Sequence, residues 1–248
     1  MTDKAFEQRR ADLVTRLGND ADMAGLTDQW LGKAQELGYS YNFDWLGLPI
    51  IQYPQDIVAM QELIWKIQPD VIVETGVARG GSLIFYASMM ELVANCGGNS
   101  DGRVIGIDID IRQPNRDAIE AHAMAKRIEL VQGSSIDTEV VDQVRDMVGD
   151  AAKVLVCLDS NHTHDHVLEE LRAYAPMTTP GSYCVVFDTL VENLPDAAIG
   201  DRPWGKGNNP LTAVRAYREE SDAFETDARI HDKLQVSVAR EGYLRRRG

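Results

Sequence analysis

The stretch Val71-Ile-Val-Glu-Thr-Gly-Val-Ala-Arg-Gly-Gly-Ser82 decides how the chain folds. Three apolar, β-favouring residues run into Glu74, and a turn with three glycines leads to the apolar segment 83–93. This pattern predicts a strand, a tight turn and the N-terminus of a helix. In open α/β sheets such a turn lies at the carboxyl end of a strand and holds a nucleotide-like ligand.

The spacing of the glycines narrows the choice of ligand. A dinucleotide-binding turn reads G-x-G-x-x-G, but position 78 is Ala, and a phosphate-binding loop needs Lys where Ser82 stands. The remaining pattern, E-x-G-x-x-x-G, is similar to the first motif of S-adenosylmethionine (SAM) methyltransferases. Its bare backbone lets a nucleoside and an amino-acid tail approach, and Glu74 can reach the ligand's ammonium. An ordinary βα turn without a ligand is the alternative.

Composition bounds the class of protein. The 248 residues are 44% hydrophobic and 26% charged, which is typical of a single soluble domain. A formal net charge of −14 argues against nucleic acid or an anionic membrane as partner, because phosphate binding depends on clustered Lys and Arg. No apolar run approaches the roughly 20 residues that cross a bilayer. We therefore expect no nucleic-acid partner and no membrane span.

Two features indicate the compartment. The N-terminal residues lack the apolar core of a signal peptide. Cys96, Cys157 and Cys184 are odd in number and show no C-x-x-C spacing, which favours reduced core thiols. We expect a cytoplasmic protein.

The N-terminal part is predicted to be helical. Residues 5–38 have apolar side chains at helical spacing, with breaks expected near Gly18-Asn19 and Gly25. The aromatic segment 39–54 then either covers a ligand or acts as a hydrophobic packing strap. We divide the chain into an N-terminal helical extension and lid, residues 1–55, and a main domain, residues 56–248.

Strands and helices alternate through the main domain. Further strands are expected at 104–108, 128–131, 154–158 and 183–187, and helices at 55–67, 114–125, 138–148, 167–174 and 211–220. Segments 234–238 and 242–245 suggest a terminal hairpin, and 190–209 is a polar loop of a length that is usually functional. The pattern predicts an α/β sheet with an antiparallel C-terminal hairpin.

Polar residues follow the second and third strands. Asp108 ends the second strand, where an acid accepts hydrogen bonds from ribose hydroxyls. We rank it ahead of Asp110, whose alternative role is that of a solvated charge. The third strand opens into a small turn, Gly133-Ser134-Ser135, where the adenine edge of SAM would rest.

The chemistry is expected where Asp159 and Asp188 end neighbouring strands. Two carboxylates with waters and a substrate oxygen suit an octahedral cation such as Mg²⁺. That cation would lower the pKa of a substrate hydroxyl. His162 and His164 are candidate general bases, and which of them points inward stays open.

The histidine run also permits a different metal centre. Two of His162, His164 and His166 can share one side, and two imidazoles with one carboxylate would suit a non-haem Fe(II) oxygenase. Against this, such oxygenases normally use another fold, and the glycine turn would then have no ligand. For His166 the simplest interpretation is the solvated start of a helix.

Five ordered segments together carry a resemblance. They are Gly47–Asp56, Glu74–Ser82, Gly106–Arg112, Leu158–His164 and Asp201–Pro210. In these segments, across roughly residues 40–240, the chain resembles the cephalosporin hydroxylase and rhamnosyl O-methyltransferase family. The resemblance implies a Rossmann-like class I methyltransferase sheet with helices on both faces, SAM as cofactor, a divalent metal, and a homo-oligomer.

The resemblance also implies roles for single residues. The expected cofactor-binding set is Glu74, Gly76, Val77, Ala78, Arg79, Gly81, Ser82, Asp108, Ile109, Gly133, Ser134, Ser135 and Asp159. Asp159 and Asp188 match metal positions. Some members carry a further acid beside the fifth-strand Asp, which this chain lacks, so Glu192 or water is left as third ligand. Catechol-type methyltransferases place their base three residues after the fourth-strand Asp, which favours His162.

These expectations define a function. The chain is expected to be a SAM- and Mg²⁺-dependent O-methyltransferase acting on a hydroxyl of a glycosylated or otherwise polyhydroxylated natural product. The alternatives are a hydroxylase that needs Fe(II) and O₂, and a SAM-binding scaffold that supports a partner enzyme.

Overall fold

A computed structural model describes residues 3–248, apart from the side chain of Asp196. Residues 1 and 2 of the predicted extension lie outside the described residues. The main sheet contains β3 (Val71–Thr75), β4 (Arg103–Asp108), β5 (Ile128–Gln132), β6 (Val154–Leu158), β7 (Tyr183–Val186), β8 (Phe224–Thr226) and β9 (Tyr243–Arg246), and a separate hairpin contains β1 (Asp44–Trp45) and β2 (Leu48–Pro49). The α-helices are α1 (Lys4–Gly18), α2 (Ala21–Glu36), α3 (Pro54–Ile67), α4 (Gly81–Asn95), α5 (Gln113–Glu120), α6 (Thr138–Val148), α7 (His164–Tyr174), α8 (Asp196–Ile199), α9 (Pro210–Glu220) and α10 (Ala228–Leu234).

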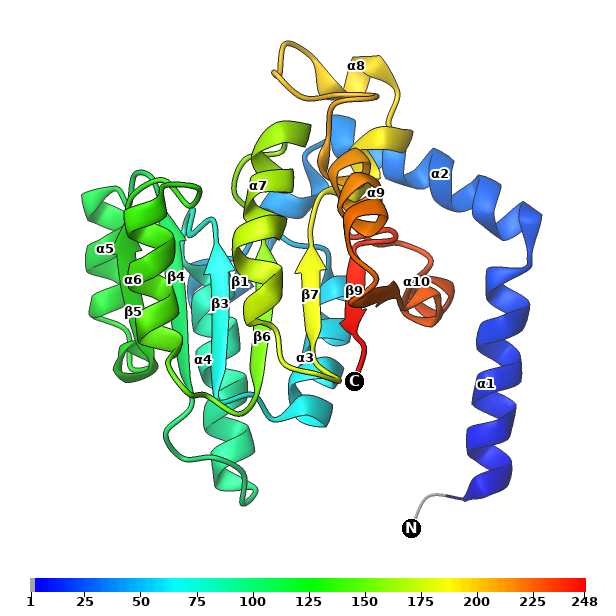
Figure 1. Cartoon of the computed structure of the whole chain (residues 1–248). Coiled ribbons are helices and arrows are strands. Elements are labelled where there is room, and N and C mark those ends of the chain that lie inside the picture. The colour runs from blue at the N-terminus through cyan, green and yellow to red at the C-terminus, as the bar shows by residue number, and fades with distance from the viewer. Residues whose placement is uncertain (1–2) are drawn as a thin grey trace.

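The order of the strands defines where a ligand can bind. In residues 3–248 the seven strands of the main sheet lie in the order β5-β4-β3-β6-β7-β9-β8, with β3 to β7 parallel and β9 antiparallel to both neighbours (Figure 1). From β3 the chain adds β4 and β5 on one side and then returns to add β6 and β7 on the other, so the strand order reverses between β3 and β6. Open α/β sheets bind ligands at the carboxyl ends of the strands at such a switch point. The predicted α/β class is confirmed.

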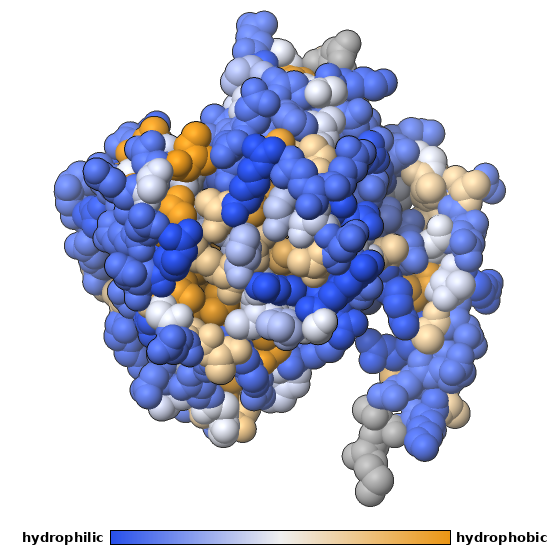
Figure 2. Space-filling model, viewed as in Figure 1, coloured by the Kyte–Doolittle hydropathy of each residue, from blue (hydrophilic) through white to orange (hydrophobic). Residues whose placement is uncertain are grey.

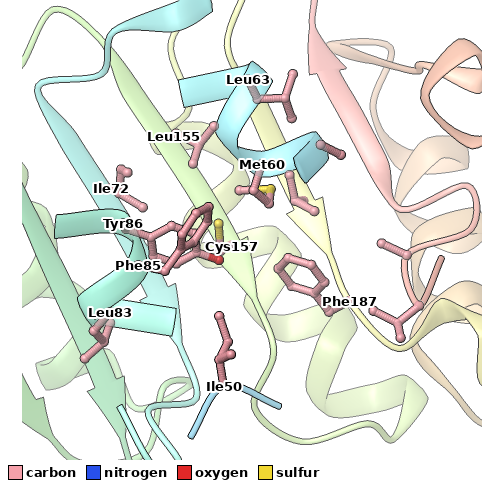
Figure 3. Packing of buried hydrophobic residues seen from close by; sticks show 14 of the residues in the cluster. Ile50, Met60, Leu63, Ile72, Leu83, Phe85, Tyr86, Leu155, Cys157 and Phe187 are labelled. Atoms are coloured by element: carbon pink, nitrogen blue, oxygen red, sulfur yellow. The ribbon is translucent and has the colours of Figure 1, made fainter. Parts of the chain in front are cut away.

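The alternation of apolar residues in the strands builds two cores. Val71 and Val73 of β3 face a core shared with α6, α7 and α9, whereas Ile72 faces a second core shared with α3, α4 and α5. Figure 3 shows part of the second core, with Leu155 and Cys157 of β6 packed beside Met60 of α3 and Tyr86 of α4. Since successive side chains of a strand point to opposite faces, a fully apolar strand requires helices on both faces. The predicted coverage of both faces is confirmed.

The predicted terminal hairpin is wrong in one of its strands. Residues 234–238 end α10 and then run irregularly, and β9 pairs with the three-residue strand β8. The reason is a buried carboxylate: Asp56 of α3 accepts hydrogen bonds from Ser237 Oγ at 2.6 Å and from Val238 N at 2.9 Å. The backbone N–H of Val238 is therefore not available to pair with a neighbouring strand. Burial raises the pKa of Asp56 to about 6.

Several element boundaries also differ from the prediction. Helix α5 ends at Glu120, five residues earlier than expected, and α7 begins three residues earlier at His164. The polar loop 190–209 contains helix α8 and most of a 3₁₀ helix, η4 (Thr189–Asn193). Helix ends depend on capping and tertiary contacts, so they follow less directly from periodicity than the elements themselves.

The N-terminal helices pack loosely against the rest. Helix α1 has no buried residue, packs on α10, and stands apart from the sheet in Figure 1 and in the mostly hydrophilic surface of Figure 2. Phe6 and Leu13 are therefore exposed, and the expected break at Gly25 is wrong because α2 runs through it. The break at Gly18-Asn19 is confirmed. In the described part of the chain no helix is long and apolar enough to cross a membrane.

The aromatic segment 39–54 packs against the core of the sheet, and Pro49, Ile51 and Gln52 within it also line a cavity beside the glycine turn. Tyr53 is fully buried, and its ring meets Trp30 and Tyr39 edge-on at 5.7 and 5.4 Å between centroids. Ile50 is buried in the same core as the sheet. The division of the chain at residue 55 stays a prediction.

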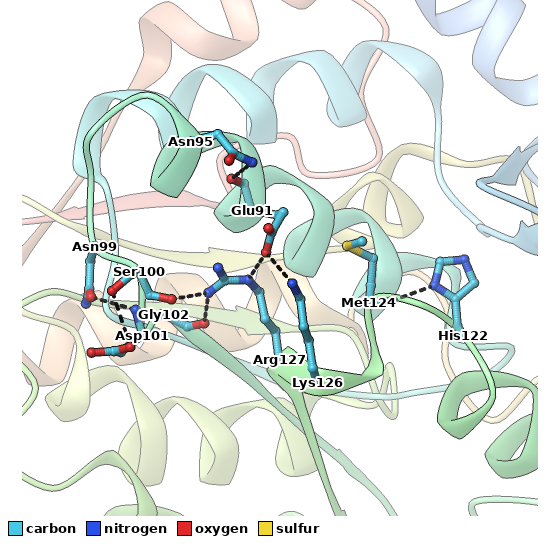
Figure 4. A network of polar contacts seen from close by, with 10 residues as sticks. All are labelled: Glu91, Asn95, Asn99, Ser100, Asp101, Gly102, His122, Met124, Lys126 and Arg127. Atoms are coloured by element: carbon cyan, nitrogen blue, oxygen red, sulfur yellow. Dashed lines mark hydrogen bonds and ion pairs between the residues drawn. The ribbon is translucent and has the colours of Figure 1, made fainter.

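A polar network closes the glycine-rich turn 96–102 (Figure 4). The nearly buried Arg127 donates to the carbonyls of Ser100 and Gly102 at 2.9 and 2.7 Å and pairs with Glu91 of α4 at 2.8 Å. Cys96 at the start of this turn is an exposed free thiol, which corrects its assignment to the core. Cys157 and Cys184 are buried free thiols, as expected.

Candidate functional site

The glycine turn after β3 forms a cradle that leaves no room for side chains. Gly76 has φ +93°, and a Cβ there would lie 2.1 Å from the carbonyl oxygen of Asp159. A Cβ on Gly81 would lie 2.2 Å from the carbonyl oxygen of Pro49. Two other segments thus approach the turn at backbone distance, which only glycine permits.

Glu74 near the end of β3 has one carboxylate oxygen without a hydrogen-bond partner among the described residues. The side chain is fully buried, and its Oε2 accepts a hydrogen bond from Ser82 Oγ at 2.7 Å. Its Oε1 has no hydrogen-bond partner among the described residues. Burial, partly offset by the hydroxyls of Ser82 and Tyr86, raises the pKa of Glu74 to about 8. A buried acceptor without a partner is costly, and an ammonium group would satisfy it.

Two cavities flank the glycine turn, and both are lined by Gly76, Ala78 and Asp159. The larger, of about 290 Å³, is lined by Gly76, Ala78, Ile107, Asp108, Ile109, Ser134, Ser135, Asp159, Ser160, Asn161, His166 and Trp204. The smaller, of about 40 Å³, is lined by Pro49, Ile51, Gln52, Gly76, Val77, Ala78, Arg79, Gly80, Gly81, Ser82 and Asp159. Every expected cofactor-binding residue except Glu74 and Gly133 lines one of the two. Gly133 does not line either cavity, and a Cβ added to it would lie against the side chain of Val140.

Asp108 lies at the cavity, and Asp110 does not. Asp108 Oδ2 accepts hydrogen bonds from the backbone N–H groups of Val77 and Ala78 at 2.9 and 3.2 Å. Its Oδ1 accepts from the N–H of Asp110, whose own exposed side chain lies 3.7 Å from Arg112. The carboxylate of Asp108 therefore ties the second strand to the glycine turn and faces the position expected for a ribose.

Two carboxylates and one imidazole meet at the ends of β6 and β7. Asp159, His162 and Asp188 each offer a ligand atom, and these atoms lie within 4.8 Å of one another. His162 Nε2 is 3.2 Å from Asp188 Oδ2. Asp188 adopts φ +54°, a left-handed conformation that costs energy outside glycine and is found preferentially at functional sites.

The cluster concentrates negative charge in a half-buried place. Burial first, and then the charges of Asp188, Glu74 and Glu170, raise the pKa of Asp159 well above its usual range. Its Oδ2 accepts one compensating hydrogen bond, from Gln52 Nε2 at 2.9 Å. Two converging carboxylates of this kind are stabilised by a bound divalent cation.

Two expected site residues lie outside the cluster. The backbone N–H of His164 donates to Asn208 Oδ1 at 2.9 Å, and its Nδ1 is 2.8 Å from Thr212 Oγ1. Glu192 accepts hydrogen bonds from the N–H of Gly207, at 2.8 Å, and from Asn209 Nδ2. The structure thus does not bring His164 or Glu192 into the cluster, and both residues hold the segment 203–209.

Three residues of the site were not foreseen. His166 lies 3.1 Å from Ser135 Oγ and 3.2 Å from Ser160 Oγ in the larger cavity, so it is not on a solvated face. Its i, i+4 spacing to the fully buried Glu170, 3.5 Å away, is a helical signal that could have indicated this. Gln52 and Trp204 come from segments expected to border the ligand, but no spacing marks them individually.

The iron alternative requires two imidazoles and one carboxylate. Of the three candidate histidines, only His162 belongs to the cluster, and it is joined by two carboxylates. This donor set favours a hard cation with oxygen ligands over the oxygenase centre.

Comparisons with known proteins agree with this geometry. The family model for "Rhamnosyl O-methyltransferase/CmcI" matches residues 37–247. A rhamnosyl O-methyltransferase of Mycobacterium leprae is 27% identical over 205 residues, which cover 82% of this chain and 82% of the relative. That of Mycobacterium bovis is 25% identical over 203 residues, covering 81% and 76%.

Solved structures share the fold. A structure of CmcI with Mg and SAM has a TM-score of 0.57 at 20% identity and covers 84% of this chain and 78% of its own. The O-methyltransferase from Bacillus cereus in complex with SAH has a TM-score of 0.51 at 15% identity, covering 80% and 81%. Because the family match spans far more than half of the chain, this protein belongs to the rhamnosyl O-methyltransferase/CmcI family.

Proposed function

We propose that this protein is a SAM- and divalent-cation-dependent O-methyltransferase that acts on a hydroxyl of a sugar-containing natural product. The observation that carries the proposal is the Asp159–His162–Asp188 cluster directly beside the glycine cradle. The names of the curated relatives support a sugar as acceptor, and the Mg and SAM of the CmcI structure support the two cofactors.

The residues present fit SAM. The unpaired Oε1 of Glu74 suits the ammonium of the methionine end, and the side-chain-free turn at Gly76 and Gly81 suits its close approach. Asp108 suits the ribose hydroxyls, and Ser135 with His166 offers hydrogen-bonding groups at the adenine end of the larger cavity. The ammonium, the ribose and the adenine of the cofactor thus each have a matching group.

The cluster fits a divalent cation with hard character. Asp159 and Asp188 supply carboxylate oxygens, and water can complete the shell, as Mg²⁺ prefers. The imidazole of His162 is a poor ligand for Mg²⁺ and is therefore left for proton transfer.

The chain's own residues provide the acid–base chemistry. When bound, SAM would supply a methyl group on a sulfonium, and the cation would lower the pKa of the acceptor hydroxyl. His162 accepts the proton of the acceptor hydroxyl at Nδ1, since its Nε2 faces Asp188. The carboxylate of Asp188 then stabilises the imidazolium.

The direct test is mass spectrometry of a methylation reaction. Purified protein is incubated with SAM, Mg²⁺ and 4-nitrophenyl α-L-rhamnoside, and a mass gain of one methylene on the glycoside is expected. Full activity after EDTA treatment would refute the cation, and calorimetry without heat on SAM addition would refute the cofactor. Incorporation of ¹⁸O from O₂ with Fe(II) would instead identify a hydroxylase, and SAM binding without turnover on a panel of glycosides would indicate a scaffold.

We also propose that the protein works in the cytoplasm as a homo-oligomer. Helix α1 supports the homo-oligomer, because it has no buried residue and leaves Phe6 and Leu13 exposed. Light scattering on the full chain should give a mass above that of a monomer, and Phe6→Ser with Leu13→Ser should lower it. An unchanged monomer mass for the wild type would contradict the proposal.

A further inference from the structure

A short hairpin, residues 203–209, stands over the larger cavity and carries Trp204; we call it the Trp204 hairpin. Its backbone closes on itself, with Gly205 N donating to Asn208 O at 2.9 Å and Asn208 N donating to Gly205 O at 3.0 Å. The side chain of Asn208 adds a bond from Nδ2 to the carbonyl of Pro203 at 3.0 Å. The position of Trp204 is thus set by a closed turn within the long loop 190–209.

Three elements of the main domain hold the hairpin from outside. Glu192 of η4 accepts from the N–H of Gly207 and from Asn209 Nδ2. His164, at the start of α7, donates its backbone N–H to Asn208 Oδ1. Asn209 is fully buried and caps α9, accepting from Leu211 N at 2.9 Å. The two residues that sequence reasoning assigned to catalysis and metal binding are therefore anchors of this hairpin.

The indole of Trp204 borders both the larger cavity and the cation cluster. It lines the larger cavity together with Asp159 and Asn161. Its ring centroid is 4.8 Å from that of His162, and the two rings are nearly perpendicular at 87°. The guanidinium carbon of Arg202 lies 5.9 Å from the indole centroid. An aromatic wall with a cation beside it thus borders the imidazole that we propose as the base.

We propose that the Trp204 hairpin recognises the acceptor, and that Glu192 and His164 are positioning residues that act through it. The proposal rests on the proposed function. The sugar ring packs its C–H groups on the indole, next to His162, while Arg202 meets its hydroxyls. Small-molecule sites combine aromatic walls with a few placed polar groups in this way.

The position of Trp204 favours the acceptor over the adenine. The end of the cavity proposed for adenine is bounded by Ser135 and His166, which hydrogen-bond to each other. Trp204 instead contacts the imidazole of His162. A ligand that presents a hydroxyl to His162 therefore lies close to this ring. A preformed wall also lowers the entropy cost of binding, which is a reason to anchor the hairpin at Glu192.

The test separates acceptor binding from cofactor binding with the rhamnoside, SAM and Mg²⁺ described above. Trp204→Ala is expected to raise the KM for the rhamnoside about tenfold or more, the size of an aromatic anchor loss, with the Kd for SAH within about twofold of wild type. Trp204→Phe should restore most of the loss. Trp65→Ala, which removes an exposed tryptophan of α3, is the matched control and should change neither constant.

The anchoring role is tested by a double-mutant cycle. Glu192→Gln removes the charge that strengthens the two hydrogen bonds Glu192 accepts, so it should raise the rhamnoside KM severalfold in the wild type. It should add little in the Trp204→Ala background, because Glu192 acts through Trp204. Hydrogen exchange at the N–H of Gly207 should become faster in Glu192→Gln and stay unchanged in the control Glu219→Gln. Should Glu192→Gln fail to fold, Asn208→Ala removes the neighbouring anchor.

Three results would overturn the proposal. These are an unchanged rhamnoside KM in Trp204→Ala, an SAH Kd weakened by the same factor as the KM, or full additivity in the cycle. A wild type that binds SAH but methylates no glycoside would overturn the proposed function instead. The SAH and hydrogen-exchange measurements would then still decide whether Glu192 anchors Trp204.

Discussion

The cofactor side and the cation side of the site are built in different ways. The cradle comes from consecutive residues, 74–82, of one strand, one turn and one helix start. The cation cluster takes Asp159 and Asp188 from the ends of two strands and His162 from the loop between them. Trp204 reaches it from a loop still further along the chain.

The cofactor side and the cation side of the site therefore have separate physical requirements. The cradle needs positions without Cβ, which is a property of the local backbone. The cluster needs the register of β6 and β7, in which Leu158 lies opposite Val186 and brings Asp159 and Asp188 to one edge. Mutations should therefore separate cofactor binding from turnover.

The largest effect is expected from the cation side. Asp188→Asn should lower kcat/KM on the order of 10³-fold, because the charge that holds the cation and orients His162 is lost. The Kd for SAH, measured by calorimetry, should stay within about twofold. The exposed Asp222→Asn serves as control. If SAH binding weakened as much as turnover, the two halves would not be separate.

The next effect is expected from the cradle. Gly76→Ala places a Cβ 2.1 Å from a carbonyl oxygen, so SAH binding should weaken about 100-fold and stability should fall by about 1–3 kcal/mol. Gly181→Ala is the matched control, since Gly181 has φ +81° but open space around it. Equal losses in both variants would attribute the effect to backbone strain alone and not to the cradle.

A third prediction concerns the proton on Glu74. Its pKa of about 8 means that the free protein is mostly protonated there at about pH 7, while a ligand ammonium favours the carboxylate. SAH binding should therefore release a proton at about pH 7, and the release should fade above about pH 8. Calorimetry in buffers of different ionisation enthalpy measures this. Glu74→Gln should show no release and about tenfold weaker binding.

The same shift predicts a trend in stability. Because the pKa of Glu74 is raised on folding from 4.5 to about 8, its contribution is fully present below 4.5 and lost as the pH rises through about 8. Chemical denaturation of wild type and Glu74→Gln across this window checks the sign. A steeper fall in the variant would contradict it.

The smallest effect is expected at the adenine end. His166→Ala removes the partner of Ser135 and Ser160, so the Kd for SAH should rise about fivefold, the loss of one hydrogen bond. Turnover at saturating SAM should not change. A large fall in kcat would indicate that His166 acts on the cation side, and the two sides of the site would then not be separate.

Much of the fold and of the cradle follows from the sequence. The apolar strands and the glycine turn at Gly76 were readable because strand period and missing side chains are local properties. The choice of Asp108 over Asp110 also agrees with the structure. Asp159, Asp188 and His162 were foreseen as a group through strand ends and the family resemblance.

Other parts depended on contacts that no local pattern encodes. The irregular path of Ser237 and Val238 follows from the buried carboxylate of Asp56, 181 and 182 positions away along the chain. Glu192 and His164 have the chemistry of site residues, but the hairpin at 203–209 takes up their hydrogen bonds. Gln52 reaches Asp159 across 107 residues.

The parallel strands β3 to β7, the cradle and the acids that follow β4, β6 and β7 could be read from the sequence, because backbone conformation and strand alternation are set by neighbouring residues. Only the tertiary structure decided which polar side chains meet at the cluster. Those meetings depend on the packing of distant segments, and hydrogen bonds to nearer partners can redirect any one of them.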